Sequence, residues 1–128
     1  MIVLDSHAWI WWWSEEPGAL SDEALRAIEG ADQIGVPTLC CYEVAEAERR
    51  ERVILDRDLH SWINQAMSAD RVTALPLTPD IAIAATRLEW DHGDPFDRII
   101  VATALHHRAP LVTKDDRIRR FEGVRTIW

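Results

Sequence analysis

The stretch DPFDRIIVATA, residues 94–104, combines the start of a helix with an acidic residue on that helix's apolar side. Asp94 followed by Pro95 places a capping residue before a proline at the first helical position, which predicts a helix over residues 96–107. The residues three, four and seven positions after Asp97 are Ile100, Val101 and Ala104. Asp97 therefore begins the apolar stripe, although an acid in the first turn also favours the helix dipole. Because buried carboxylates are rarely unpaired, we expect Asp97 to have a function.

Short apolar segments alternate with helix-forming segments along the rest of the chain. Strands are expected at residues 2–4, 34–36, 72–77, 111–113 and 124–127. Helices are expected at residues 8–13, 22–29, 39–52, 56–69, 79–90, 96–107 and 116–121, with Ser21, Thr38 and Thr78 as caps. This alternation predicts an α/β fold with a mainly parallel sheet of four or five short strands, covered by helices on both faces. A length of 128 residues suits one domain, residues 1–128.

Three further acids occupy positions that a single site would need. Asp5 follows the strand at 2–4, and Asp115 comes two residues after the strand at 111–113. Ligands of open α/β sheets bind beyond the carboxyl ends of the strands. Glu43 is predicted to lie on a helix beside apolar residues, namely Leu39, Cys40 and Ala47. Its side chain therefore points along the apolar side of that helix.

Each of these acids also has a structural explanation. Asp5 and Asp115 can cap the helices that follow them, and Glu43 can pair with Arg49 or Arg50. Four carboxylates in one place repel one another, which should raise their pKa values, and a divalent cation would account for the set. Oxygen ligands suit a hard cation such as Mg²⁺, which can orient phosphate oxygens and activate a water. The five histidines show no metal-binding spacing, and none is expected to be catalytic.

Four segments together resemble the PIN-domain ribonucleases, specifically the VapC-type toxins of toxin–antitoxin pairs. They are Leu4-Asp5-Ser6-His7-Ala8, Cys41-Tyr42-Glu43-Val44-Ala45, residues 94–104, and Leu111-Val112-Thr113-Lys114-Asp115. The resemblance covers essentially the whole chain, and residues 94–104 are its most specific part. It implies a single PIN domain, a compact three-layer α/β/α sandwich whose acids bind Mg²⁺ or Mn²⁺ and cleave single-stranded regions of RNA.

The resemblance also implies roles for individual residues. Asp5, Asp97 and Asp115 would be metal ligands, and Glu43 would bind the metal directly or through water. A second tier would orient ligands or water, namely Asp94, Thr113 and Asp116. Ser6 stands where similar sequences often carry threonine and keeps the hydroxyl. Arg98 is expected to contact RNA or to form a structural ion pair.

The net charge of −8 argues against a general nucleic-acid binder, because phosphate contacts need lysine and arginine. Clustered catalytic acids would make a metal nuclease more acidic than its binding surface. Two other functions are compatible with acids at strand ends. One is a receiver-like, metal-binding phosphoacceptor module, which the sequence disfavours because no acidic pair follows the first strand. The other is a catalytically vestigial PIN protein that only forms complexes, which the complete set of acids disfavours.

Seven tryptophans are present, and four of them crowd residues 9–13. Consecutive positions 11–13 span too much of a helix for all to enter one core, so at least one is expected to be exposed or covered by a partner. We expect an interface here, for a homodimer or a cognate antitoxin, with base stacking as a third possibility. No segment is apolar enough to span a membrane and no signal peptide is evident, so a cytoplasmic location is expected. The adjacent Cys40 and Cys41 are expected to be reduced.

Overall fold

Five short strands form one sheet in the computed structural model, which describes residues 1–128. They are β1 (Ile2–Leu4), β2 (Ile34–Pro37), β3 (Val72–Leu75), β4 (Leu111–Val112) and β5 (Thr126–Ile127). Their order is β3-β2-β1-β4-β5 and every neighbouring pair is parallel. The central strand β1 places Val3 beside Gly35 of β2 and Leu111 of β4. The carboxyl ends of all five strands therefore meet at one edge of the sheet.

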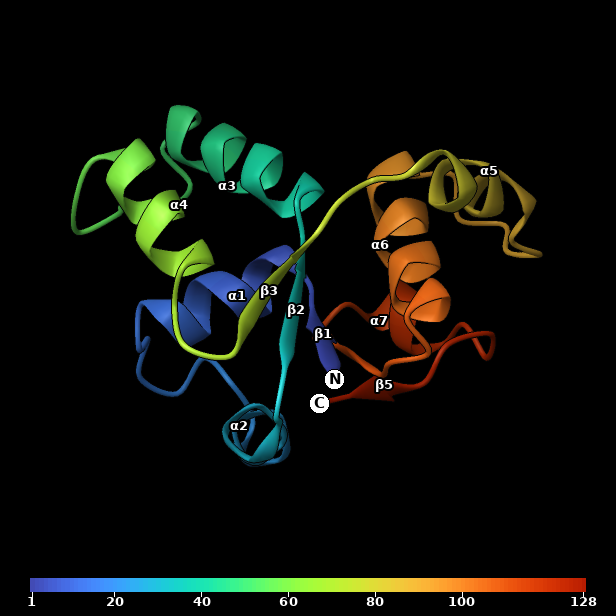
Figure 1. The fold of residues 1–128 in the computed structure, drawn as a ribbon, viewed down its shortest axis with the longest axis horizontal. Helices are drawn as coiled ribbons and strands as arrows, with labels where there is room; N and C mark the ends of the chain where they lie inside the picture. Colours follow the sequence, from blue (N-terminus) through green and yellow to red (C-terminus); the bar gives the residue numbers. More distant parts are fainter.

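Seven helices cover the two faces of this sheet (Figure 1). They are α1 (Ser6–Trp13), α2 (Asp22–Gly30), α3 (Leu39–Arg49), α4 (Leu59–Met67), α5 (Pro79–Arg87), α6 (Pro95–His106) and α7 (Asp116–Arg119). In this view α1, α3 and α4 lie mainly to the left of β1 and β2, and α5, α6 and α7 lie to their right. The expected three-layer α/β/α sandwich with a parallel sheet is confirmed.

Three of the four predicted helix caps are confirmed, and one is wrong. The side chain of Asp94 accepts from the backbone N–H of Phe96 at 2.9 Å, and Ser21 and Thr78 cap α2 and α5 in the same way. Thr38 makes no side-chain capping bond, because its own backbone is already helical, with φ −61° and ψ −22°. A capping residue needs extended backbone to turn its side chain toward the first free N–H groups.

Several elements are shorter than the sequence pattern predicts. The helix expected over 79–90 ends at Arg87, which leaves residues 88–94 as a loop in front of α6. The helix expected from 56 begins at Leu59, because Asp58 caps it by accepting from Ser61 N at 3.0 Å. The other shortened elements are α3, β3, β4, α7 and β5, which lose one to three residues at an end.

The tryptophan-rich segment packs into the main core. Trp9 is fully buried, and its ring meets that of Trp62 edge to face at a centroid distance of 5.1 Å. Trp11, Trp12 and Trp13 are half-buried against the same core, so none of the three is wholly exposed. Both cysteines are free thiols, and every helix is too short or too polar to cross a bilayer.

Candidate metal centre

Asp5 and Asp115 both lie beyond the carboxyl edge of the sheet, because they follow the neighbouring strands β1 and β4, in which Leu4 pairs with Val112. Asp5 is buried and caps α1 by accepting from Ala8 N at 2.8 Å. One carboxylate oxygen of Asp115, Oδ1, caps α7 by accepting two backbone N–H groups. Both acids therefore cap helices, which is the structural role considered for them above. The capping bonds use only Oδ1 of each acid, so Oδ2 is not engaged in capping.

The Thr113 hydroxyl joins these two acids. Thr113 is fully buried, and its Oγ1 accepts from Asp115 N at 3.1 Å. A hydrogen bond from the same side chain lowers the pKa of Asp5, but burial has the larger effect, and the pKa of Asp5 is raised. The Thr113 side chain thus connects the backbone at Asp115 with the carboxylate of Asp5.

Glu43 points into the site and is not part of the charged face of α3. Ser6 Oγ donates to Glu43 Oε1 at 2.6 Å, which joins α1 to α3. Arg49 and Arg50 both bind Glu46 instead, at 2.6 and 2.7 Å, so the expected alternative of an Arg pair for Glu43 is wrong. Burial raises the pKa of Glu43, and the negative charges of other acids raise it further.

Asp97 is the acid around which the others gather. Burial raises its pKa most, and the negative charges of Asp94 and Asp115 add to the rise. The charge of Asp97 in turn raises the pKa values of Asp5 and Glu43. These charge interactions place Asp97 of α6 near Asp5 after β1, Glu43 of α3 and Asp115 after β4. Mutual repulsion raises the pKa values of Asp5, Glu43 and Asp97, as predicted, but desolvation is the larger cause.

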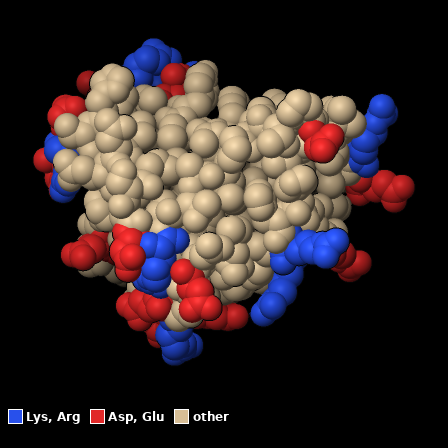
Figure 2. Space-filling view, in the orientation of Figure 1, with Lys and Arg blue, Asp and Glu red and all other residues tan.

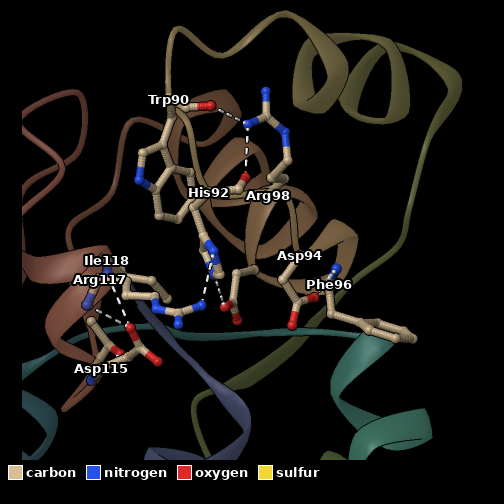
Figure 3. Close-up of polar contacts among 10 residues, drawn as sticks. Trp90, His92, Asp94, Phe96, Arg98, Asp115, Arg117 and Ile118 are labelled. Carbon is tan, nitrogen blue, oxygen red and sulfur yellow. Dashed lines mark hydrogen bonds and ion pairs between the residues drawn. The ribbon is translucent and has the colours of Figure 1, made fainter.

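Sequence reasoning missed a histidine in this site. His92 Nε2 lies 2.6 Å from Asp97 Oδ2, and the imidazole is only 9% exposed (Figure 3). Its ring packs edge to face on Trp90, at a centroid distance of 4.9 Å. Donor atoms of His92, Asp94 and Asp97 lie within 4.8 Å of one another. The sequence signal for this histidine is the spacing His-x-Asp-x-x-Asp over residues 92–97, which a search for spacings between histidines does not detect.

Arg98 has a different role from the one expected. Its guanidinium donates to four backbone carbonyls, those of Ala85, Leu88, Trp90 and His92, at 2.7–3.0 Å. It forms no ion pair, so that expectation is wrong, and its donors are occupied by the chain itself. Arg98 instead fastens the loop 88–94 to α6, and this loop carries His92 toward Asp97 (Figure 3).

The two second-tier acids lie differently. Asp94 is exposed at the start of α6, where one oxygen caps the helix and the residue remains close to Asp97. Asp116 is 77% exposed, and its carboxylate is 3.9 Å from Arg119 Nη1. Asp94 therefore remains a candidate ligand, whereas Asp116 faces solvent.

The donor set fits a divalent cation. Asp5, Glu43 and Asp97 are withdrawn from water, their pKa values are raised, and no lysine or arginine forms an ion pair with any of them. Buried carboxylates need a counter-charge, and a metal ion supplies it. Carboxylate oxygens on separate elements match the ligands of Mg²⁺ and Mn²⁺, and His92 supports one of these carboxylates by its contact with Asp97.

Comparison with known proteins gives the class of this chain. Residues 2–124 match the PIN domain family, so the chain belongs to that family. Within it, the chain is 41% identical to Ribonuclease VapC22 of Mycobacterium tuberculosis, over 99% of this chain and 98% of the relative. The resemblance to VapC-type proteins is confirmed.

Solved structures show the same fold at low identity. A toxin–antitoxin complex from Klebsiella pneumoniae matches with a TM-score of 0.67 and 22% identity, over 96% of this chain and 93% of that chain. VapBC2 from Rickettsia felis, solved with a promoter DNA fragment, matches with a TM-score of 0.66 and 16% identity, over 98% of this chain and 97% of that chain.

Proposed function

We propose that this protein is a metal-dependent endoribonuclease that cleaves single-stranded regions of RNA. The observation that carries the proposal is the convergence of Asp5, Glu43, Asp97 and Asp115 at the carboxyl edge of the sheet. Membership of the PIN family and the ribonuclease name of the 41% identical relative support the same activity.

Asp5, Asp97 and Asp115 are the proposed ligands of Mg²⁺, or of Mn²⁺ in its place, and Glu43 binds directly or through water. A divalent ion held by these residues would neutralise charge at the phosphate and would lower the pKa of a bound water. The chain's own groups hold this arrangement: Ser6 fixes Glu43 by its 2.6 Å hydrogen bond, and His92 fixes Asp97. Such supporting hydrogen bonds orient ligands and sustain their affinity for the metal.

We further propose that the protein is a toxin that a cognate antitoxin inhibits in the cytoplasm. The matching solved structures include toxin–antitoxin complexes. A groove of about 410 Å³ between α1 and α2 suits such a partner. Its apolar side chains are Trp11, Trp12, Leu20 and Leu25, and its acidic ones are Glu15, Glu16 and Glu29. A basic segment with apolar anchors would complement this lining.

A homodimer is proposed on the uncharged face of the molecule. Figure 2 shows a broad surface over β3 and the chain leading to α5, with charged side chains mostly at its rim. Leu77, between these elements, is 45% exposed, and Ile83 of α5 is 59% exposed. Apolar surface of this kind marks interfaces. Analytical ultracentrifugation should give the mass of two copies, and Leu77→Glu should give one; a wild-type monomer would refute the dimer.

The other two functions fit the structure less well. Membership of the PIN family argues against a receiver-like phosphoacceptor module. A vestigial enzyme would not be expected to retain all four acids, together with the Ser6, Thr113 and His92 side chains that hold them.

The activity is tested with purified protein and matched substrates. A labelled RNA with a single-stranded loop, the same sequence as a full duplex, and the corresponding single-stranded DNA are each incubated with Mn²⁺, Mg²⁺ or EDTA. Metal-dependent cleavage confined to the single-stranded RNA is expected. Equal cleavage with EDTA, or no cleavage of RNA under any metal, would refute the proposal.

A further inference from the structure

A second groove opens directly beside the acids. It has a volume of about 1010 Å³ and lies between the loop in front of α6 and the chain from α7 to β5. Its lining includes His92, whose other face contacts Asp97. Trp90 and Phe121, stacked with a centroid distance of 4.8 Å, form an apolar wall. One end of the groove therefore adjoins the proposed metal centre.

Several basic side chains of this protein are bound to other groups of the chain. Arg49 and Arg50 bind Glu46, and Arg71 donates to carbonyl groups at the end of α2. Arg98 is occupied by four backbone carbonyls, that of Ala85 in α5 and three in the loop 88–94. None of these guanidinium groups is free to neutralise a phosphodiester that approaches the acids.

Arg117 lies at the edge of the site and is not bound in this way. It lines the groove, and its Nη1 lies 3.4 Å from His92 Nδ1, a long contact that places the guanidinium next to the His92–Asp97 pair (Figure 3). The side chain is exposed and has no carboxylate partner. A phosphate beside several carboxylates is repelled unless a cation lies close to it. Arg117 is placed to supply that charge.

The rest of the lining limits what the groove can bind. Arg120 adds one positive charge, whereas Glu89, Asp91 and Glu122 add three negative charges. Such a surface does not attract polyanions in general, in keeping with the net charge of −8. A single arginine contact beside an apolar aromatic wall suits one nucleotide of a strand, whose phosphate pairs with the arginine while its base covers apolar surface.

We propose that this groove binds the RNA nucleotide next to the scissile phosphate, with Arg117 bound to that nucleotide's own phosphate. The inference rests on the proposed ribonuclease function and adds a substrate-binding site to it. Arg117 replaces Arg98 as the arginine that contacts RNA. The long contact to His92 is exchanged for a charge-assisted bond to a phosphate oxygen when RNA enters.

The test measures binding without cleavage, in protein carrying Asp97→Asn. Fluorescence anisotropy with a short labelled single-stranded RNA is recorded over a series of salt concentrations. Arg117→Gln should weaken binding about tenfold, the loss expected for one charged hydrogen bond. The slope of log K against log salt should fall by about 0.7, the value for one phosphate contact to a single strand. Arg117→Lys should restore most of the slope.

Arg119→Gln is the matched control, because Arg119 lies on the same short helix, is exposed, and has only a 3.9 Å contact to Asp116. It should bind as the Asp97→Asn parent does, and all variants should melt at the same temperature. Equal losses for the Arg117 and Arg119 variants would overturn the inference. An Asp97→Asn parent that binds no RNA would also overturn the inference. If the wild type still cleaves RNA in that case, only the groove proposal fails. If the wild type does not cleave RNA, the proposed function fails as well.

Discussion

His92 Nε2 lies 2.6 Å from Oδ2 of Asp97, so a loop residue holds the acid around which the whole site is organised. The contact fixes one oxygen of Asp97 and leaves the other free for a ligand. Arg98, the next residue of α6, fastens the His92 loop by bonding to its carbonyls. Two consecutive residues of one helix thus have different roles, Asp97 as a proposed metal ligand and Arg98 as a support for the loop.

Loss of His92 should weaken metal binding without unfolding the protein. Removal of a side chain that orients a metal ligand typically costs 10–100-fold in affinity. His92→Ala is therefore expected to raise the Kd for Mn²⁺, measured by calorimetry, by about 10–100-fold. His60→Ala, an exposed histidine of α4, is the control. Unchanged affinity in His92→Ala would show that Asp97 needs no support from the loop.

Glu43 should destabilise the metal-free protein at neutral pH. Burial raises the pKa of Glu43 in the folded protein. Its protonated form is therefore favoured by folding, and this contribution to stability is full below the pKa of the unfolded chain. The contribution is lost as the pH rises through the raised pKa of the folded state. Glu43→Gln keeps an acceptor for Ser6 and removes the charge. In EDTA, this variant should melt above the wild type at pH 7, and the difference should vanish near pH 4.

Glu46→Gln on the same helix provides a control of opposite sign. Hydrogen bonds from Arg49 and Arg50 lower the pKa of Glu46 to about 2, so this residue stabilises the fold above the pKa of the unfolded chain and loses that effect in acid. The variant should melt at or below the wild-type temperature at pH 7. If Glu43→Gln behaves like Glu46→Gln, then Glu43 is a surface acid and not part of the site.

Metal should stabilise the folded protein through the same acids. A ligand that binds only the folded state at a hundredfold excess over its Kd adds about 2.7 kcal/mol. Thermal melting with increasing Mn²⁺ should therefore raise the Tm of the wild type progressively. The Tm of Asp97→Asn should respond far less, and a response equal to that of the wild type would place the ion elsewhere.

Arg98 should matter for stability more than its position beside Asp97 suggests. Each hydrogen bond from a charged group contributes about 1.5–3 kcal/mol, and Arg98 makes four partly buried ones, to the carbonyl of Ala85 in α5 and to three loop carbonyls. Arg98→Gln is expected to cost about 2–4 kcal/mol in urea unfolding and to weaken Mn²⁺ binding by releasing His92. Arg87→Gln, an exposed arginine at the end of α5, should cost less than about 0.5 kcal/mol. Similar costs for both variants would contradict the role assigned to Arg98.

The sheet, its helices and the positions of the four acids could be predicted, because local sequence patterns determine them. Asp94 with Pro95 starts a helix by its own chemistry, and apolar periodicity places Asp97 on the buried side. Asp5 and Asp115 follow parallel strands, whose carboxyl ends must meet. These features depend on residues within a few positions of one another, or on a general rule of parallel sheets.

The roles of His92, Arg98 and Arg117 could not be predicted in the same way. Each depends on how the loop in front of α6 folds, and the predicted helix 79–90 extended α5 into the first three residues of that loop. The sequence indicates that Arg98 contacts RNA or an acid, whereas in the fold its guanidinium donates to backbone carbonyls. No local pattern around Arg117 predicts its contact with His92, because that contact depends on where α7 lies in the fold.

RNA cleavage by Asp97→Asn tests the central claim most directly. The measurement is the single-turnover rate on a fluorescently labelled single-stranded RNA with saturating Mn²⁺, compared with the wild type and with Asp80→Asn. Asp80 also lies in the first turn of a helix that begins with a cap and a proline, but it is exposed on α5, away from the acids. We predict a loss of at least about 100-fold for Asp97→Asn and a wild-type rate for Asp80→Asn. Cleavage by Asp97→Asn at the wild-type rate would contradict the assignment of the acid cluster as the active site.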